Sequence, residues 1–335
     1  MPTQFIRCAA LAALLVASAA GAEPITLKMP FFTSDRSTIY QCQIKPFVDA
    51  VNTDKTQAIR VEVDFGPSVD RTIADQPKLL MSGAADIAVV APTATPEAFP
   101  DTAVALLPGL FKDQSEAGQV YLNMVQTGAL ADYRNFFVIG TAISANDDIH
   151  SRKPLAKLAD LHGQTIRGSN PIEIETLRAL GANSFFLPFN RTMDSLAQGK
   201  IDGVTGAPAI MYDFGFARLT SHHFMLGLGS VPSIVAMSRA RFESLPGPAQ
   251  AVVRKYSGAW LMKKSIACLE AKGREILKLF EQDPRRTVTF PSPADQATAD
   301  TIFSAVIEKW AAQSPRHRAL LSAIKAEIAR VRAAR

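Results

Sequence analysis

An arginine at the end of a predicted strand is the residue in this sequence best suited to bind an anion. The stretch "LADLHGQTIRGSN" predicts a short helical segment, a tight turn and a strand that ends at Arg167, with small residues after it. In α/β proteins the carboxyl ends of the strands face the crevice where ligands bind. A guanidinium held there offers a fixed fork of donors to a carboxylate. The residues alone leave one alternative open, in which Arg167 pairs internally with a distant Asp or Glu.

The other residues that could do chemistry form no complete catalytic or metal-binding motif. The sequence has no G-x-S-x-G, H-E-x-x-H or P-loop motif, and "GLGSVP" has proline where the third glycine of a dinucleotide-binding loop belongs. His222 and His223 point to opposite faces if they lie on a strand, and no cysteine or acidic pair stands beside them at ligand spacing. Asp147 and Asp148 lie in a predicted polar loop, where we expect solvated carboxylates. We therefore expect no cofactor, no metal and no enzymatic activity.

The N-terminal residues predict an export signal. Arg7 stands directly before the apolar run "CAALAALLVASAA", and Ala20-Gly21-Ala22 supplies the small residues that a signal peptidase needs. We expect residues 1–22 to be removed and the remainder to be periplasmic. No later stretch is long and apolar enough to span a bilayer, so we do not expect a membrane-inserted protein.

Composition indicates a globular protein with two lobes. The chain has 335 residues, of which 47% are hydrophobic and 20% charged, and its net charge of +5 is too diffuse for a nucleic-acid partner. Two cysteines follow the predicted signal, Cys42 and Cys268, and an exported protein lies in an oxidising compartment. Sequence gives no distance between them, so a disulfide and two separately buried thiols both remain possible.

The order of predicted elements indicates α/β layers with a largely parallel sheet. "PITLKM", "IRVEVDF" and "ADIAVVAP" read as strands, and residues 38–51 as a helix between the first two. A second strand and helix series starts after Asn146. Residues 248–282 have apolar or small side chains three or four apart and predict one helix, about 50 Å long, beneath both lobes. The segment "HHFMLGLGSVPSIVAMS" is the predicted return crossing.

These patterns predict a discontinuous division of the chain. Lobe I comprises residues 23–146 and 229–265, and lobe II comprises residues 147–228 and 266–335, with the helix over 248–282 shared between them. The lobes are joined by crossing strands, because no flexible linker separates them.

Several ordered motifs resemble one family. "LADLHGQTIRGSNPIEIETLRALGAN", "LPF", "LAQGKIDGV" and "RARFESLPGPAQAVV" resemble the DctP-like solute-binding proteins of TRAP transporters, as do "MSGAADIAVVAP" and "AVALLPGLFKDQSEAGQVY" nearer the N-terminus. The resemblance covers nearly all of residues 24–310. It implies a periplasmic binding protein, type II-like, with a cleft between two α/β lobes. It also implies that Arg167 binds the carboxylate of a small organic acid, which the protein delivers to the membrane subunits of a TRAP transporter.

Two departures from the family pattern bear on the ligand. "GVTGAP" stands where similar proteins read Gly-Gln-Glu-Asn-Pro, which places Thr205 to Ala207 at the position of an asparagine that often helps bind the carboxylate. Asn146 stands where many relatives carry a second arginine. Losing that arginine removes one charge-assisted contact, so we expect a monocarboxylate rather than an acid with several carboxylates.

The remaining site candidates follow from chemistry and from the resemblance. Phe32 and Phe189, with Phe31, are candidates for apolar walls of the site. Arg36 and Arg71 are cationic candidates near the rim of the first lobe, and Thr93 and Tyr212 lie in stretches that line the cleft in similar proteins.

Two other functions are compatible with these residues. In one, the protein is an exported α/β enzyme that uses Arg167 to hold an acid and Asp202 or Asp213 as a base, although no nucleophile or metal motif supports it. In the other, the same fold is the input receptor of a sensor, with no transporter as its partner.

Overall fold

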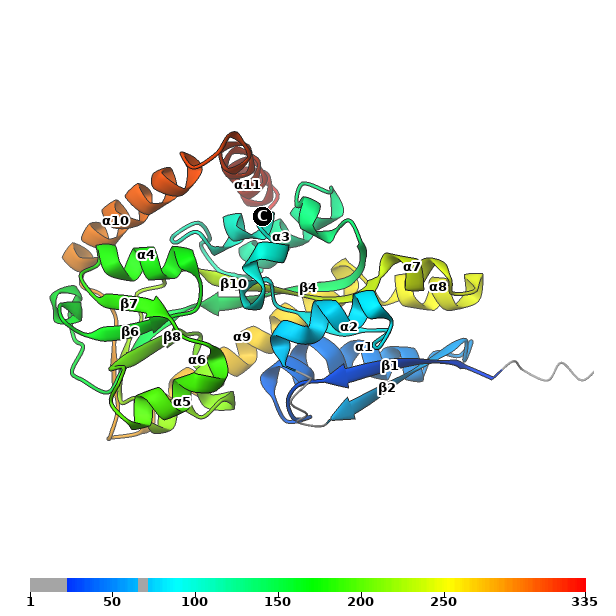
Figure 1. Ribbon diagram of the computed structural model, residues 1–335, viewed down its shortest axis with the longest axis horizontal. Helices are drawn as coiled ribbons and strands as arrows, with labels where there is room; N and C mark the ends of the chain where they lie inside the picture. Colours follow the sequence, from blue (N-terminus) through cyan, green and yellow to red (C-terminus); the bar gives the residue numbers. More distant parts are fainter. Residues whose placement is uncertain (1–22, 66–71) are drawn as a thin grey trace, which may run out of the picture.

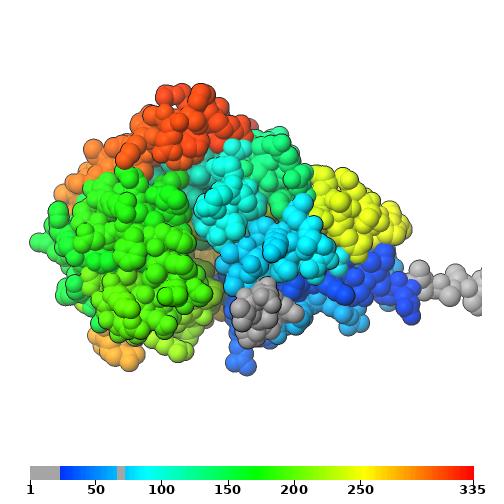
Figure 2. Space-filling view, viewed as in Figure 1, coloured from blue at the N-terminus to red at the C-terminus, as the bar shows by residue number. Residues whose placement is uncertain are grey.

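The computed structural model describes residues 23–65 and 72–335, and it has two α/β lobes separated by a furrow (Figures 1 and 2). The predicted signal peptide lies outside the described residues. The first lobe holds a parallel pair, β1 (Ile25–Phe31) with β2 (Ile59–Phe65), and a sheet in the order β3 (Ala88–Val90), β10 (Ser230–Ser238), β4 (Phe136–Asn146). Its helices are η1 (Tyr40–Ile44), α1 (Lys45–Asn52), α2 (Gln76–Ser82), α3 (Gln114–Gln126), α7 (Arg239–Glu243) and α8 (Gly247–Lys255).

The second lobe is built on one six-stranded sheet. Its order is β11 (Thr287–Thr289), β9 (His222–Phe224), β5 (Asp148–Ser151), β8 (Gly203–Gly206), β6 (Thr165–Gly168), β7 (Asn183–Phe186). Its helices are α4 (Pro171–Ala179), α5 (Phe189–Ala197) and α6 (Pro208–Asp213). The short 3-10 turn η7 (Leu158–Leu161) lies between β5 and β6, and η8 (Phe216–Arg218) lies between α6 and β9. Three more helices complete the chain: α9 (Ala259–Gln282), α10 (Pro293–Ala311) and α11 (Pro315–Ala333).

The sheets are mixed, so the prediction of a largely parallel sheet is wrong in its detail. β6 runs parallel to β7 and β8, and β11 runs parallel to β9. However, β5 is antiparallel to both β8 and β9, and β10 is antiparallel to β3 and β4. The antiparallel pairs arise where the chain crosses from one lobe to the other, and alternation of strands with helices in the sequence does not report this.

The chain crosses between the lobes next to β4 and next to β10. β4 continues into β5 after one residue, and residues 225–229 carry the chain back from β9 to β10. Gly229 has a φ of +141°, and a Cβ built there would lie 2.8 Å from the carbonyl oxygen of Leu106. Only glycine fits that conformation and that close approach, so the return crossing depends on it.

The single long helix predicted over residues 248–282 is two helices. α8 ends at Lys255, and α9 begins at Ala259 after Gly258, whose φ is +62° and whose N–H donates to the Ile139 carbonyl oxygen at 2.7 Å. The side-chain period continues through this break, which is why the sequence pattern suggested one helix. A positive φ at Gly258 cannot be read from that period, because it depends on the contact with β4.

α9 nevertheless packs in both lobes. Leu261, Met262 and Ile266 in its first half join apolar clusters of the first lobe, whereas Ile276 and Phe280 join the cluster under β8 and α6 in the second. With 24 residues at about 1.5 Å per residue, its length is about 36 Å. One rigid helix thus has one end in each lobe.

The C-terminal helices differ from the predicted division. α10 contributes Phe303 to the core of the second lobe and Trp310 to the core of the first. α11 packs on α3 through Leu320, Ile324 and neighbouring apolar residues, so it covers the first lobe although the sequence placed residues 266–335 in the second. An amphipathic pattern shows that a helix has a buried face but not which surface buries it. Within residues 23–65 and 72–335, no helix combines the length and apolar character that a membrane span requires.

Candidate functional site

Arg167 lies in the middle of the second lobe. β6 pairs with β7 on one side and β8 on the other, so the backbone of Arg167 is held opposite Phe185 and Val204. Its side chain is nearly buried, with 6% exposed, and its Nε donates to the carbonyl oxygen of Leu187 at 3.1 Å. In the described part of the chain it makes no other side-chain hydrogen bond and no ion pair within 4.0 Å. The two Nη groups of Arg167 therefore have no hydrogen-bond partner among the described residues.

Two carboxyl groups lie near this cation without pairing to it. Burial lowers the pKa of Arg167, while the charges of Glu173 and Asp147 raise it. Glu173 is in the first turn of α4, where it accepts from the N–H of Ser169 and Asn170 caps the helix by accepting from the N–H of Glu173 at 3.0 Å. The Arg167 side chain is thus held by a hydrogen bond to the backbone, and Glu173 and Asp147 raise its pKa without pairing with it.

Asp147 and Asp148 are buried, so the prediction of solvated carboxylates is wrong. Their exposed fractions are 5% and 6%. Burial raises the pKa of Asp147, helped by the charges of Glu173 and Asp148, while Arg167 and the N–H of Ala207 lower it. Burial also raises the pKa of Asp148 to about 7, against a hydrogen bond of 3.0 Å from the N–H of Gly227. β4 ends at Asn146 and β5 begins at Asp148, so only one residue separates the two strands and no polar loop forms there.

Phe189 connects the arginine to an aromatic cluster. The Cζ atom of Arg167 lies 5.8 Å from the centre of the Phe189 ring. That ring makes edge contacts with two others, and its centre lies 4.4 Å from the centre of the Phe214 ring and 5.1 Å from that of Phe216. Apolar contact around a guanidinium is the environment that suits a ligand with one charged end and one apolar end.

The first lobe carries a second aromatic cluster. Phe32 is partly exposed and lies 4.9 Å from Phe31, which is itself fully buried. Tyr40 and Phe65 complete this cluster, with their rings 4.7 Å apart. Phe31 therefore belongs to the core, Phe65 is exposed, and Phe32 and Tyr40 are partly exposed.

Two more of the predicted residues lie beside Arg167. Thr205 is buried in β8 and its Oγ1 donates to the carbonyl oxygen of Arg167 at 3.3 Å. Ala207 is the N-cap residue directly before α6, and a hydrogen bond from its N–H lowers the pKa of Asp147. We call Arg167, Phe189, Thr205 and Ala207 together the Arg167 site.

The structure places the other candidates elsewhere. Asn146 is exposed at the end of β4, where its Oδ1 accepts from Ser230 Oγ at 2.9 Å. Tyr212 is 57% exposed on α6, and Arg36 is exposed in the turn before η1. Arg71 lies outside the described residues.

Thr93 lines a separate cavity of about 520 Å³ between residues 92–106, α4 and α10. Its walls are mostly apolar, and Lys309 on its rim is paired with Glu175 at 2.5 Å. Arg167 does not line this cavity. The cavity and the buried cation therefore indicate two different positions for a ligand site. We base the site on the charge, since only Arg167 is a buried cation without an acidic partner within 4.0 Å in the described part of the chain.

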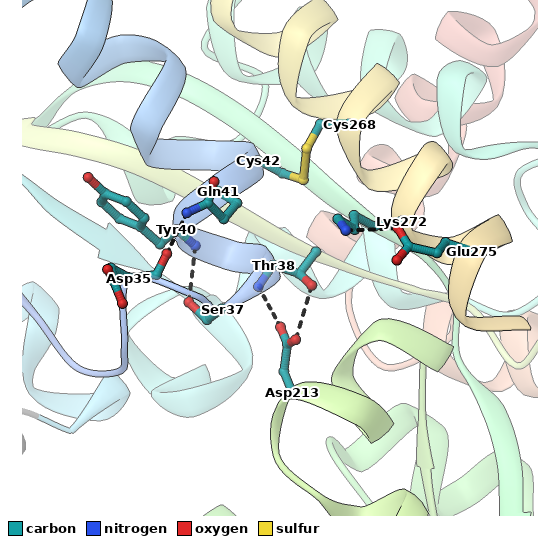
Figure 3. Close-up of a disulfide and its surroundings, with 10 residues drawn as sticks. All are labelled: Asp35, Ser37, Thr38, Tyr40, Gln41, Cys42, Asp213, Cys268, Lys272 and Glu275. Carbon is teal, nitrogen blue, oxygen red and sulfur yellow. Dashed lines mark hydrogen bonds and ion pairs between the residues drawn. A yellow bond between two sulfur atoms is a disulfide. The ribbon is translucent and has the colours of Figure 1, made fainter. Parts of the chain in front are cut away.

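A contact between the lobes lies beside a disulfide (Figure 3). Thr38, just before η1, donates to Asp213 at the end of α6 through its backbone N–H at 2.7 Å and through Oγ1 at 3.1 Å. Cys42 and Cys268 form a disulfide between η1 and α9, with 5.3 Å between their Cα atoms, which settles the alternative that the sequence left open. The segment that reaches the second lobe is therefore covalently held to the helix that spans both.

The adjacent histidines have unequal environments. His222 is partly exposed, whereas His223 is fully buried and its Nδ1 lies 2.7 Å from Nδ1 of His150. His150 Nε2 donates to the carbonyl oxygen of Gly206 at 2.9 Å, so its Nδ1 accepts from His223. Burial lowers the pKa of His150 to about 4, so both rings are neutral near pH 7. Among the described residues, no group of three or more potential metal ligands occurs.

Comparison with known proteins identifies the family. Residues 28–314 match the model of the bacterial extracellular solute-binding proteins of family 7, the DctP family. A solute-binding protein of Verminephrobacter eiseniae is 23% identical over 228 residues, which cover 64% of this chain and 68% of the relative. The match to the family model covers most of the chain. The chain therefore belongs to the DctP family of TRAP solute-binding proteins.

Solved structures of TRAP solute-binding proteins share the fold of this chain. A TRAP solute-binding protein specific for aromatic acids, from an unidentified marine microbe and bound to 3-hydroxybenzoate, superposes with a TM-score of 0.85 at 22% identity, covering 92% of this chain and 99% of the other. One from Rhodoferax ferrireducens with bound benzoate superposes at 0.81, also with 22% identity, and covers 92% and 99%. Proteins of this family are extracytoplasmic receptors that bind small organic acids and work with TRAP membrane subunits.

Proposed function

We propose that this protein is the periplasmic receptor of a TRAP transporter for an aromatic monocarboxylate. The observation that carries the proposal is Arg167, a nearly buried guanidinium with no acidic partner within 4.0 Å in the described part of the chain. A buried cation of this kind is costly unless an anion completes it. The ligand carboxylate takes that place, and closure of the lobes around it gives the form that docks on the membrane subunits.

The aromatic surroundings favour a ring on the ligand. Phe189 flanks the guanidinium on the second lobe, and the partly exposed Phe32 and the exposed Phe65 belong to the cluster on the first. Both the marine receptor and that of Rhodoferax ferrireducens hold benzoate-like acids. With Asn146 in place of a second arginine, a single carboxylate suits the site better than two.

The enzyme alternative has little support because its two candidate bases have other partners. Asp202 forms an ion pair with Lys153 at 2.8 Å and accepts from the N–H of Thr165 at 2.8 Å. Asp213 accepts both hydrogen bonds of Thr38. We therefore propose binding without turnover, preceded by export through a cleaved signal over residues 1–22.

Titration calorimetry with benzoate, 3-hydroxybenzoate and succinate tests the proposal. We expect at least one aromatic acid to bind more tightly than succinate, without product formation. Arg167→Ala leaves the ligand carboxylate without its charged partner, which costs about 2–5 kcal/mol and weakens binding roughly thirtyfold or more.

The matched control is Arg218→Ala, which removes the same charge from an exposed position on the second lobe. We expect it to bind like the wild type. Equal binding by Arg167→Ala and Arg218→Ala would show that the carboxylate is held elsewhere. Conversion of the acid into another compound would revive the enzyme alternative.

A further inference from the structure

Two buried histidines of the second lobe have no role in the proposed function as it stands. His150 on β5 and His223 on β9 lie directly opposite each other in the pairing of these two strands. Both side chains are fully buried, and their Nδ1 atoms lie 2.7 Å apart. We call them the histidine pair. Buried polar groups need partners, so the partners of the two remaining ring nitrogens indicate what the pair does.

The two ends of the histidine pair meet groups of opposite hydrogen-bonding character. Nε2 of His150 lies 2.9 Å from the carbonyl oxygen of Gly206, which can only accept. Nε2 of His223 lies 3.3 Å from Nη1 of Arg286, and a guanidinium can only donate. His223 therefore carries its proton on Nδ1 and donates it to His150, whose own proton on Nε2 is donated to Gly206. The hydrogen bonds thus run in one direction, from Arg286 to Gly206.

The end of the histidine pair that is remote from Gly206 is fixed by packing and by an ion pair. The ring of His223 stacks on the ring of Phe280, with 4.3 Å between their centres and 12° between their planes. Phe280 is itself buried near the end of α9. Arg286 is held by Asp283, whose Oδ2 lies 3.2 Å from the Nε of the arginine. The donor that His150 presents is therefore supported from behind by fixed neighbours.

The other end of the histidine pair reaches the ligand site. Gly206 is the last residue of β8 and stands between Thr205 and Ala207, which are two of the four residues of the Arg167 site. Thr205 Oγ1 donates to the carbonyl oxygen of Arg167 at 3.3 Å, and β8 pairs with β6 beside that arginine. A shift of the Gly206 carbonyl would therefore move the residues on both sides of it relative to Arg167.

We propose that His150 is a positioning residue of the ligand site, which holds the Gly206 carbonyl through its Nε2–H and is itself oriented by His223 and Arg286. The inference rests on the proposed receptor function and deepens it. Without this donor the segment from Thr205 to Ala207 is less firmly fixed. The apparent affinity for the ligand then falls by the fraction of molecules in which the segment is correctly placed.

Benzoate calorimetry near neutral pH tests the inference with three variants of His150. His150→Phe keeps a ring but has no nitrogen, and His150→Asn keeps an acceptor for His223 on a side chain too short to reach Gly206. We expect both to bind benzoate about tenfold more weakly than the wild type. His150→Gln has an amide N–H long enough to reach the Gly206 carbonyl, and we expect it to bind within about threefold of the wild type.

Two further measurements separate positioning from a contribution to the fold alone. Denaturant titration of each variant gives the free energy of unfolding, so that the affinity of the folded protein is compared independently of its stability. His222→Phe is the matched control, because His222 adjoins His223 on β9 but is partly exposed and lies outside the histidine pair. We expect it to bind benzoate like the wild type.

Nitrogen NMR of the imidazoles in the wild type checks the direction of the hydrogen bonds. We expect the proton of His150 on Nε2 and that of His223 on Nδ1. The opposite tautomers would remove the donor to Gly206 and overturn the inference.

Wild-type affinity in His150→Phe or in His150→Asn also overturns the inference and leaves the receptor function standing. An equal loss of affinity in His150→Gln and His150→Asn overturns it as well, since the reach to Gly206 would then be irrelevant. The comparison of the asparagine and glutamine variants decides even if His150→Phe fails to fold. Absence of binding of benzoate and the other aromatic acids by the wild type refutes the proposed function itself.

Discussion

Replacing Thr38 by valine removes one of the two hydrogen bonds that join the lobes beside η1, while the size and branching of the side chain stay the same. Asp213 would lose the donor at 3.1 Å from Thr38 Oγ1 and keep the backbone N–H at 2.7 Å. Thr38 is 5% exposed, so water does not readily replace the lost donor when the lobes are together. When the lobes separate, Asp213 regains water, and the substitution therefore acts on the closed form.

The magnitude follows from the charge of the acceptor. A hydrogen bond to a charged group contributes about 1.5–3 kcal/mol, and the remaining backbone donor keeps the loss near the lower limit. If the ligand-free protein is mainly open, a closed form destabilised by about 1.4 kcal/mol weakens ligand binding about tenfold, because the ligand must supply the difference. The site around Arg167 is untouched, so the contacts of the bound ligand stay the same.

The assay is benzoate affinity by calorimetry together with the radius of gyration in solution, with and without benzoate. We expect Thr38→Val to need about ten times more benzoate to reach the compact form, with the same final radius. Thr298→Val is the matched control, since Thr298 is exposed on α10 and its Oγ1 donates to the carbonyl oxygen of Ala294 in the same helix. Equal affinity of the two variants would refute the reasoning that the Thr38 and Asp213 contact stabilises closure.

Three further predictions concern stability. Replacing Cys42 and Cys268 together by serine should lower the free energy of unfolding by about 2–5 kcal/mol, measured by denaturant titration, because the bond closes a loop with a sequence separation of 226; an unchanged midpoint would show that the bond does not form. Gly229→Ala should cost about 1–3 kcal/mol in thermal unfolding, since its Cβ would lie 2.8 Å from a carbonyl oxygen, and wild-type stability would mean that the crossing relaxes freely. The pKa of Asp148 is raised from its usual 3.8 to about 7, so its contribution to folding stability is fully present below about pH 4 and is lost as the pH rises through 7. Asp148→Asn should thus stabilise the protein above pH 7, by at most about 4 kcal/mol. A variant no more stable than the wild type at about pH 8 would contradict this. His150 acts in the opposite direction, with a pKa lowered to about 4, so Asp148→Asn should lose stability as the pH falls from about 6.5 to 4 more steeply than the wild type.

Local chemistry was enough to predict the element that holds Arg167. The turn glycine before β6, the small residues after it, and Pro171 in the first turn of α4 all act within a few residues, and the structure has each element there. The position of Gly229 in the return crossing was predictable for the same reason, because glycine marks backbone conformations that other residues rarely adopt.

Features that depend on distant parts of the chain were not predictable in this way. The break at Gly258 depends on the Ile139 carbonyl oxygen, more than a hundred residues earlier, and the side-chain period passed over it. The direction of β5 in its sheet likewise depends on β8 and β9, which approach from later in the sequence.

The sequence by itself determined that an arginine lies near the end of a strand in an α/β protein, and its ordered motifs determined the family. Only the tertiary structure decided that Asp147 is buried near that arginine, that Thr38 reaches Asp213, and that Cys42 bonds to Cys268. The physical reason is that burial, charge environment and covalent pairing are set by distances between segments remote in sequence. Propensity and periodicity describe what each segment can do alone, whereas the pKa of a carboxyl depends on which neighbours the fold brings to it.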